Sequence, residues 1–418
     1  MEKRLLYLCN RAFWPVTGGH ETEMYHYCRG LHDEMGYQID VLLFEDEEKV
    51  DPDRKPAFID EVMIAEPIRK TEKIANILFK SLFGKDQWPL QCSLYYSESN
   101  SKMISQLTDK GYDVIFVDMI RLAPYYFSFK DFKGRKILDI DDCLSKRYQR
   151  QLDNLDHKTM IAGQYNERLP LFLQKILRSM FIKRTILNLE IPRMEKAESY
   201  YSDLYDKVIF ASAVETEEFN RKKGNDKAVN IPVGVDYEHF CAPLSVKKEE
   251  ATAVYTGNLK TATNADSVRM IVNKILPLSK RIKKLLLVGD YSEELEKEFV
   301  GNERIEFIGH TDDVREYVKR AAVFLSPLVY GTGIKTKILE AMAMGVPVVT
   351  NSIGVEGIPG QNNEHWLASD DHKKLAEYAD HLIDDKAEAE RIAENAQKLV
   401  EGKFRWENVF AQFRKLGI

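Results

Sequence analysis

The feature that most constrains the fold is a segment that runs from Val323 to Thr350. It opens with a short apolar stretch, crosses a glycine loop, and enters a run of strong helix formers that ends at Gly345. Pro347 then stops the helix, and the residues up to Thr350 have the apolar character of a buried strand. Strand, glycine turn, helix and strand predict a βαβ unit whose helix starts at the carboxyl edge of a parallel sheet.

The glycine loop of this unit is a natural place for an anion. Unpaired backbone N–H groups converge at a helix start, and the helix dipole adds partial positive charge there. Gly331 and Gly333 allow the main chain to approach a phosphate, while Lys335 and Lys337 add full charges. The segment therefore predicts a phosphate-binding turn.

Glu340 lies between one and two turns into the predicted helix if that helix begins near Ile334. A carboxylate in that position accepts hydrogen bonds from two neighbouring hydroxyls, such as those of a ribose. An ordinary βα turn with solvated lysines and a Glu that pairs with one of them has the same spacing. The pattern alone leaves both interpretations open.

The stretch 331–349, followed by 354–358, resembles the donor-site signature of retaining GT-B glycosyltransferases of the group 1 family, also called glycosyltransferase family 4. Many members carry a Glu, seven further residues and a second Glu; this chain has Thr332 and Glu340 at those places. The same departure occurs in a bacterial exopolysaccharide sub-branch, which the segment also resembles. The resemblance implies the GT-B form of the α/β class, with two Rossmann-like, doubly wound domains that face an interdomain cleft.

The length of 418 residues exceeds what one ordinary core organises, so the sequence predicts two domains. We expect an acceptor-side domain over 1–245 and a nucleotide-sugar-binding domain over 246–400, divided by polar, linker-like sequence. In the family that the chain resembles, a last helix, here 401–418, returns to the N-terminal domain.

The composition excludes several classes of protein. No stretch approaches 18 uninterrupted apolar residues, so no transmembrane span is expected. The five cysteines are scattered without CxxC spacing, which argues against a disulfide or zinc framework. A net charge of -6 and the lack of a basic and aromatic module argue against nucleic acid as a partner. These features predict a cytoplasmic protein.

The N-terminal half offers three candidate features. A Gly18-Gly19 turn follows the first apolar strand, and the group 1 family places a similar pair against the donor from the opposite domain. Asp118 ends another strand, near the place where these enzymes usually carry a histidine. The role of that histidine is therefore not carried over to this chain. Asp118 becomes a candidate acceptor contact or base. The carboxylates of 139–142 would bind a metal, act as a base, or cap the following helix.

The second domain carries the other candidates. The resemblance implies that a basic residue near the Gly257 turn, here Lys260, lies with Lys335 at the donor diphosphate. Further expected donor contacts are Gly257, His310, Thr311, Thr332, Gly333, Ile334, Lys337 and Glu340.

The resemblance implies transfer of a hexose-type sugar, with retention at the anomeric carbon, from a nucleotide diphosphate donor to a glycan or lipid-linked glycan acceptor. Negative charge that grows on the departing diphosphate would be stabilised by Lys335, Lys260 and the loop amides, so no metal ion or other cofactor is expected. In the family, the departing phosphate assists deprotonation of the acceptor. A non-catalytic GT-B partner of a glycosyltransferase and a sugar-nucleotide 2-epimerase are alternative hypotheses.

Residues 169–184 form a broad apolar stripe flanked by basic side chains. Such a stripe suits an interfacial helix on anionic lipid, at the inner face of the plasma membrane, and it equally suits a core-facing helix with a solvated edge.

Overall fold

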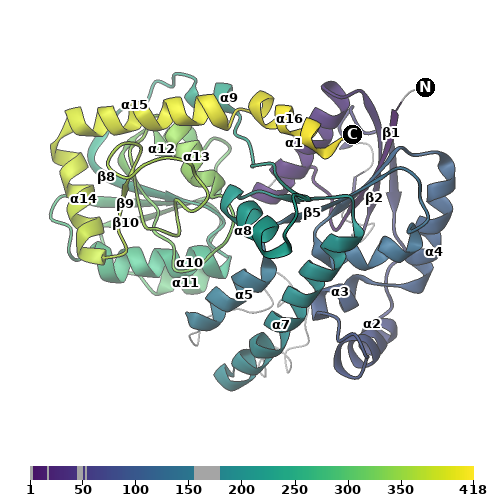
Figure 1. The fold of residues 1–418 in the computed structure, drawn as a ribbon. Coiled ribbons are helices and arrows are strands. Elements are labelled where there is room, and N and C mark those ends of the chain that lie inside the picture. The colour runs from purple at the N-terminus through teal and green to yellow at the C-terminus, as the bar shows by residue number, and fades with distance from the viewer. Residues whose placement is uncertain (1–2, 17, 45–49, 52–53, 155–178) are drawn as a thin grey trace. The chain divides into compact units, whose positions relative to one another are not determined.

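The computed structural model describes residues 3–16, 18–44, 50–51, 54–154 and 179–418 (Figure 1). It divides into two compact units, the first made of 1–149, 186–232 and 409–418 and the second of 150–185 and 233–408. The division falls after Pro232, upstream of the boundary expected after residue 245, because the connector joins the second unit. There Val235 donates its N–H to the carbonyl of Phe404 at 2.7 Å.

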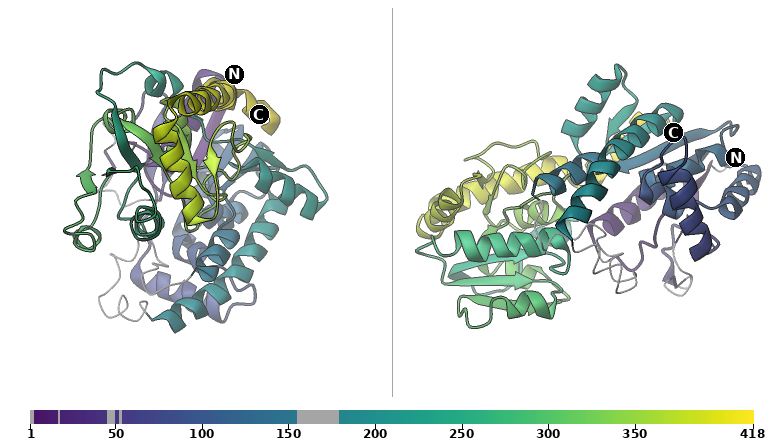
Figure 2. Two further views of the ribbon diagram at one scale, coloured as in Figure 1. Left: turned by 90° about the vertical axis from the view of Figure 1, so that its left-hand side faces the viewer. Right: turned by 90° about the horizontal axis from the view of Figure 1, so that it is seen from below.

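The first unit is built on a seven-stranded parallel sheet in the order β3-β2-β1-β4-β5-β6-β7. Its central strands are largely apolar because helices cover both faces (Figures 1 and 2). The side chains of 5–9, for example, have no exposed area. The strands are β1 (Lys3–Cys9), β2 (Tyr37–Leu43), β3 (Glu61–Ile64), β4 (Val114–Asp118), β5 (Arg135–Asp141), β6 (Lys207–Phe210) and β7 (Ala228–Asn230).

Helices of the first half of the chain pack through spaced apolar positions. In α1 (Gly19–Asp33), the face that contains Met24, Tyr27 and Leu31 is buried, as its spacing predicts. Tyr27 also packs edge-on against Phe413, which ties the last residues of the chain to this unit. The other helical elements are α2 (Lys70–Asn76), η3 (Ile77–Leu82), α3 (Leu90–Tyr95), α4 (Glu98–Leu107), η4 (Thr108–Lys110), η5 (Ile120–Ser128), α5 (Leu144–Asp153), α7 (Met180–Leu204) and α8 (Ala213–Lys223).

After β5 the described chain continues in α5 and α7. Residues 155–178 lie outside the described part of the chain, and most of the amphipathic segment 169–184 lies there with them.

The second unit is built on a six-stranded parallel sheet in the order β10-β9-β8-β11-β12-β13. Figure 1 shows α10 and α11 on one face of this sheet and α12 and α13 on the other. The strands are β8 (Glu249–Thr256), β9 (Lys284–Val288), β10 (Ile305–Gly309), β11 (Ala321–Leu325), β12 (Val348–Thr350) and β13 (Leu367–Ala368). The helical elements are α9 (Tyr237–Cys241), α10 (Ala262–Met270), η7 (Ile271–Ile275), α11 (Glu293–Lys297), α12 (Arg315–Val318), α13 (Thr336–Ala343), α14 (His372–Asp384), α15 (Lys386–Lys403), α16 (Trp406–Phe413) and η8 (Arg414–Leu416).

The segment 323–350 folds as predicted, with β11, a glycine loop, α13 and β12 in succession. The helix begins at Thr336 rather than near Ile334, because Lys335 keeps extended backbone angles as its N-cap residue. Gly345 follows the helix with a φ of 69°, the left-handed conformation that glycine adopts without strain.

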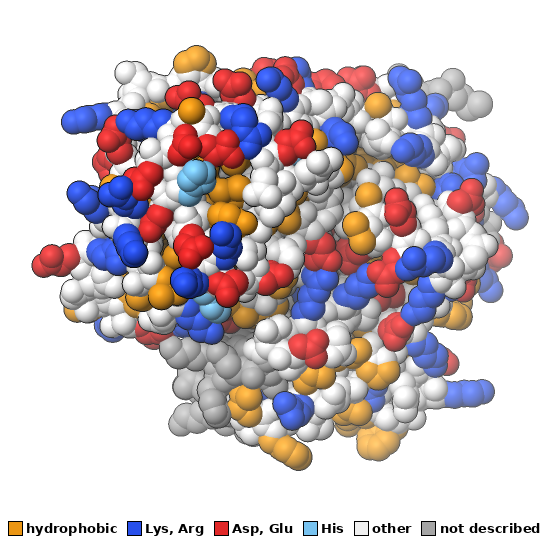
Figure 3. Space-filling view, turned by 60° about the vertical axis from the view of Figure 1, so that its left-hand side comes forward, with side chains coloured by type: hydrophobic (Ala, Val, Ile, Leu, Met, Phe, Trp, Pro, Cys, Tyr) orange, Lys and Arg blue, Asp and Glu red, His pale blue; other side chains and the backbone are white. Residues whose placement is uncertain are grey.

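Two doubly wound parallel sheets, one in each unit, confirm the predicted α/β class. Among the described residues, no helix combines the length and apolar content needed to span a bilayer. Acidic and basic side chains are interspersed over the face drawn in Figure 3, so this face carries no broad patch of one sign.

Candidate functional site

The carboxyl edge of the second sheet is lined by glycine backbone. Gly257 and Gly289 directly follow β8 and β9, and Gly309 ends β10; their φ values are 142°, 122° and 81°. Gly289 donates its N–H to the carbonyl of Gly309 at 2.8 Å, and a Cβ atom on Gly289 would lie 2.0 Å from the carbonyl oxygen of Gly257. These strand exits pack so closely that only glycine fits in the middle one.

The loop between β11 and α13 is fixed from two sides. Asn351 donates a side-chain N–H to the carbonyl of Leu328 at 2.7 Å and accepts the N–H of the same residue at 3.0 Å. The hydroxyl of Tyr330 donates to Asp266 at 3.1 Å. Gly333, with a φ of 66°, then turns the chain into α13. The amides of the loop are thereby held at a helix start, an arrangement suited to anions.

Lys335 places a positive charge on this loop. Its ammonium group folds back and donates to the carbonyl of Thr332 at 2.9 Å and to that of Gly333. The charge therefore lies at the start of α13, where the sequence predicted it.

Lys337 lies against the core side of the helix. Its Nζ donates to the hydroxyl of Tyr255 at 2.6 Å and to the side chain of Asn264 at 2.9 Å, and lies 3.9 Å from the Tyr255 ring centroid. Burial, with the nearby charge of Lys335, lowers the pKa of Lys337 to about 7, although Glu340 opposes the shift. The structure thus gives Lys337 a role in tying α13 to β8 and α10.

Glu340 lies on α13 with its side chain partly buried. Burial raises the pKa of Glu340 to about 7, against the opposing charge of Lys337. Within the described part of the chain, its carboxylate forms neither a hydrogen bond nor an ion pair. The alternative in which Glu340 pairs with a neighbouring lysine is therefore not what the structure forms.

The remaining predicted donor residues follow strands of the same sheet. Lys260 is exposed just beyond Gly257 and has its backbone N–H bound to Asn258 at 3.1 Å. His310 follows β10 with 75% of its side chain exposed, and the hydroxyl of Thr311 accepts the N–H of Asp313 at 3.3 Å. The structure therefore brings these residues and the glycine loop to one edge of one sheet.

Gly18, Gly19 and Asp118 belong to the first unit. Gly18 and Gly19 are exposed at the start of α1, where Gly18 has an extended backbone with a φ of -155°. A Cβ atom on Gly18 would lie 2.6 Å from a carboxylate oxygen of Glu21, so the glycine leaves room for that side chain.

Asp118 lies beside a residue that sequence reasoning missed. The carboxylate is the last group of β4 and is fully buried, and its Oδ1 lies 3.0 Å from Nε2 of His20. The other nitrogen of His20 lies 3.5 Å from Glu23 and 3.7 Å from Asp141. The signal available in the sequence was a histidine in the turn after β1, because β4 is the strand next to β1 in this topology.

Charge controls the protonation of this cluster. Burial alone disfavours an imidazolium, but the charge of Asp118, with Glu23 and Asp141, raises the pKa of His20 well above its ordinary value. Burial acts against the ionised form of Asp118 as well, yet His20 keeps the pKa of that carboxyl below its usual range. The pair is therefore an imidazolium and a carboxylate.

One atom each from His20, Glu23 and Asp141 lie within 4.8 Å of one another. A metal ion would require a neutral imidazole. A bound metal ion would displace the ring proton that the surrounding carboxylates otherwise favour.

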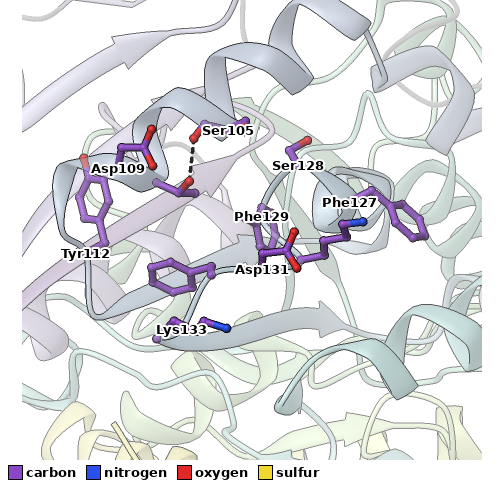
Figure 4. Close-up of a pocket in the computed structure, with 12 residues that line it drawn as sticks. Ser105, Asp109, Tyr112, Phe127, Ser128, Phe129, Asp131 and Lys133 are labelled. Carbon is purple, nitrogen blue, oxygen red and sulfur yellow. Dashed lines mark hydrogen bonds between the residues drawn. The ribbon is translucent and has the colours of Figure 1, made fainter.

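A pocket of about 530 Å³ lies at the opposite edge of the first sheet (Figure 4). Tyr112 and Gly134, which line it, precede β4 and β5, so the pocket faces the amino ends of these strands. Ligands of open α/β sheets bind at the carboxyl ends. None of the residues that the sequence singled out lines this pocket.

Residues 250–385 match the family model for glycosyl transferases group 1. An uncharacterized glycosyltransferase of Methanocaldococcus jannaschii is 29% identical over 41% of the chain and 45% of the relative. The capsular polysaccharide biosynthesis glycosyltransferase CapM of Staphylococcus aureus is 26% identical over 32% of the chain and 37% of the relative. The chain thus spans less than half the length of these two relatives. An uncharacterized protein in the cps region of Klebsiella pneumoniae is 24% identical over 72% of the chain and 80% of the relative.

Solved structures resemble the whole chain. Sucrose-phosphate synthase from Thermosynechococcus elongatus matches with a TM-score of 0.67 at 17% identity, over 99% of the chain and 98% of that protein. HepE of Anabaena, solved with UDP-glucose, matches with a TM-score of 0.63 at 14% identity, over 99% of the chain and 98% of HepE. These likenesses establish the GT-B fold. The family match supports a relationship to group 1 glycosyltransferases and falls on the unit that carries the glycine exits.

Proposed function

We propose that the chain is a glycosyltransferase that moves a sugar from a nucleoside diphosphate donor to a glycan acceptor during synthesis of a cell-surface polysaccharide. The observation that carries the proposal is the edge around α13. Loop amides and Lys335 gather at the helix start, and Glu340, without a partner among the described residues, lies just over one turn further on. The group 1 match and the capsular relatives support the same class of reaction.

In the proposed complex, the donor diphosphate lies on the amides of Gly333 and Ile334. Lys335 and Lys260 supply the positive charge, and Glu340 accepts hydrogen bonds from the ribose hydroxyls. As the bond between the anomeric carbon and the phosphate oxygen breaks, its electron pair stays on the diphosphate. The cations then bind the transition state more tightly than the ground state, which lowers the barrier.

We extend the proposal to a hexose-type sugar and to retention at the anomeric carbon, because the glycine loop and Glu340 resemble the retaining group 1 signature. The reaction as proposed uses no metal ion or other cofactor, since side chains and amides of the chain supply the positive charge at the diphosphate.

Donor hydrolysis without an acceptor tests this function. The protein is incubated with UDP-, GDP- and ADP-sugars, and release of the nucleoside diphosphate is followed over hours. We expect slow release from one donor class, and thermal stabilisation by the matching nucleoside diphosphate. A non-catalytic partner, the alternative suggested by Thr332 in place of the first Glu, would release nothing from any donor.

Contact with a membrane is a second part of the proposal. In the stretch α2–η3, Phe79 is 71% exposed, and Phe83, the residue directly after η3, is 79% exposed. Phe181, at the described end of the segment 169–184, is 79% exposed. Lysines flank the apolar side chains of α2–η3, a combination that suits anionic lipid. A lipid-linked acceptor at the inner face of the plasma membrane would be reached from such a surface.

Vesicle sedimentation tests this contact. With vesicles of phosphatidylcholine and phosphatidylglycerol at low salt, the double variant Phe79→Ser/Phe83→Ser should sediment less than the wild type. Val300→Ser, which removes a side chain of 78% exposure from the second unit, is the matched control and should sediment like the wild type. Equal sedimentation of all three proteins would remove α2–η3 from the proposal.

A further inference from the structure

The pocket at the amino edge of the first sheet is a cavity that the proposed reaction does not use (Figure 4). Its volume of about 530 Å³ falls within the range of about 300–1,000 Å³ that is usual for small-molecule sites. One wall consists of the end of α4 with η4, and the other is the segment 127–134, from the end of η5 to the start of β5. In Figure 4, Asp109 and Tyr112 lie toward one end of the pocket and Phe127 toward the other. All of the lining belongs to the first unit.

Hydrogen bonds fix the two walls of this pocket. The hydroxyls of Ser101 and Ser128 lie 2.8 Å apart and join α4 to η5. Within the second wall, Phe132 donates its N–H to the carbonyl of Phe129 at 3.0 Å, and its own carbonyl accepts from Nζ of Lys136 at 2.9 Å. The pocket is therefore formed before a ligand arrives, so binding requires little further ordering of the chain.

Aromatic rings form the apolar part of the lining. Phe127 is 50% exposed, whereas Phe129 is only 2% exposed. The ring of Phe132 lies directly on the backbone of Gly134, where an added Cβ atom would be 2.5 Å from its Cζ. Aromatic side chains offer large, rigid apolar faces. A pyranose ring, which carries C–H bonds on its faces and hydroxyls at its edge, packs well against such a surface.

Charged side chains of both signs surround these rings. The lining includes Asp109, Lys130, Asp131 and Lys133, all of them exposed. Within the described ranges, none of these four side chains forms a hydrogen bond or an ion pair. Carboxylates accept hydrogen bonds from hydroxyls, and ammonium groups donate to hydroxyl oxygens. Because two acidic and two basic groups cancel, the pocket has no net attraction for an anion.

We propose that this pocket binds a segment of an uncharged oligosaccharide. The rings of Phe127 and Phe132 pack against sugar faces, and the four charged groups bind the hydroxyls. A lipid tail offers nothing to four charged groups, and the balance of their charges disfavours a nucleotide or an acidic polymer. Sugars combine an apolar face with a polar edge, as this lining does.

The inference rests on the proposed function in one respect, because the glycan would be the acceptor chain. Strand β4 has five residues and spans about 17 Å at 3.3 Å per residue, so this distance separates the pocket from the carboxyl edge of its sheet. Reactants of open α/β sheets bind at the carboxyl ends of the strands. The pocket therefore holds a part of the glycan away from its reacting end.

Isothermal titration with hexasaccharides tests the site. The probes are maltohexaose and cellohexaose, which are uncharged, and a hyaluronan hexasaccharide, which is acidic. We expect an uncharged probe to bind the wild type. Phe127→Ala and Asp131→Asn should each weaken this binding about 5-fold or more, since one removes a ring contact and the other a charge-assisted hydrogen bond. Phe79→Ala removes another exposed phenylalanine of the same unit, is the matched control, and should bind like the wild type.

Two results of this titration would overturn the site. They are a wild type that binds neither uncharged hexasaccharide, and equal binding by the wild type and both pocket variants. Tighter binding of the acidic hexasaccharide would overturn the uncharged class of ligand. Melting temperatures close to that of the wild type are expected for Phe127→Ala, because half of this side chain is already exposed.

Donor hydrolysis separates this inference from the proposed function. Phe127→Ala should cleave the donor at the rate of the wild type, because the pocket lies away from the carboxyl edge of its sheet. A clearly lower rate would place the ring at the reacting groups and overturn the remote position. A wild type that binds the hexasaccharide through the pocket but cleaves no donor would remove the glycosyltransferase and leave the glycan site.

Discussion

The carboxyl edges of the two sheets present different kinds of chemistry. In the second unit the strands leave through glycines, and the edge is lined by amides with one lysine folded over them. In the first unit β4 and β5 leave through Asp118 and Asp141, and a histidine lies among buried carboxylates. Under the proposed function, a backbone-lined edge suits the diphosphate of any donor, because all diphosphates present the same oxygens. An edge lined by side chains distinguishes one arrangement of hydroxyls from another.

The largest effect is expected from removing the charge at the backbone-lined edge. Lys335→Ala should lower turnover by about two orders of magnitude or more, because a charge-assisted contact made in the transition state contributes about 2–4 kcal/mol. Initial rates at saturating donor measure this effect. Lys335→Arg keeps the charge and should retain more activity than the alanine variant.

Lys297→Ala, which removes an exposed lysine paired with Glu293, is the control for general loss of charge. Because Lys335 also binds carbonyls of its own loop, the melting temperature of each variant is measured alongside. Near-normal turnover in Lys335→Ala would show that the edge of the second sheet supplies no more charge to the reaction than the edge of the first. Lys335 would then have no role in stabilising the departing diphosphate.

The next prediction concerns the glycine packing itself. Gly289→Ala should destabilise the second unit by about 3 kcal/mol, the sum of left-handed strain and a Cβ contact at 2.0 Å with the carbonyl of Gly257. Gly301→Ala shares the left-handed conformation, with a φ of 87°, and has nothing within 4 Å of the added atom. It should cost only about 1–2 kcal/mol.

Urea unfolding followed by a probe in the second unit compares the two alanine variants. Equal losses of stability would mean that strain alone, and not close approach of the strand exits, requires glycine at this edge.

Glu340→Gln should weaken nucleotide binding about 10- to 100-fold, since hydrogen bonds to a charged group contribute about 1.5–3 kcal/mol. The same variant tests which atoms Glu340 contacts. In the wild type, a 2′-deoxynucleoside diphosphate should bind more weakly than the ribonucleotide, and in Glu340→Gln that difference should shrink. Isothermal titration measures both. A difference between the two nucleotides that is unchanged in Glu340→Gln would place the ribose elsewhere.

The two edges also differ in how far the sequence predicted them. The βαβ unit around α13 depends on contiguous residues, so its strand, glycine loop and helix are visible as one pattern. Its inner contacts were not predictable, because Lys337 binds Tyr255 and Asn264, which belong to other elements of the fold. Spacing along one helix contains no information about what that helix packs against.

The first unit shows the same limit more strongly. Asp118 was a candidate as the last residue of a strand, whereas His20 was not among the candidate residues. The two residues are 98 positions apart in the sequence, and only the strand order places β1 beside β4. Once that order is assigned, a histidine in the turn after one strand and a carboxylate at the end of its neighbour predict a pair.

The smallest expected effect is a pH dependence specific to the second unit. Burial favours the neutral forms of Glu340 and Lys337 and moves the pKa of each to about 7. Between the usual glutamate range and pH 7 the folded state binds more protons than the unfolded state, so the stability of this unit falls as pH rises. Above pH 7 the unfolded state binds more protons, because its lysine keeps its charge until near pH 10, and stability rises again. Without nucleotide, these two groups therefore give the unit a minimum of stability near pH 7.

Melting temperatures of the wild type, Glu340→Gln and Lys337→Met across this range test the assignment. The glutamine variant should lose the falling limb and the methionine variant the rising limb, with differences of about 2–4 °C for each kcal/mol. Profiles that stay parallel in all three proteins would show that neither group pays a cost of burial at this edge.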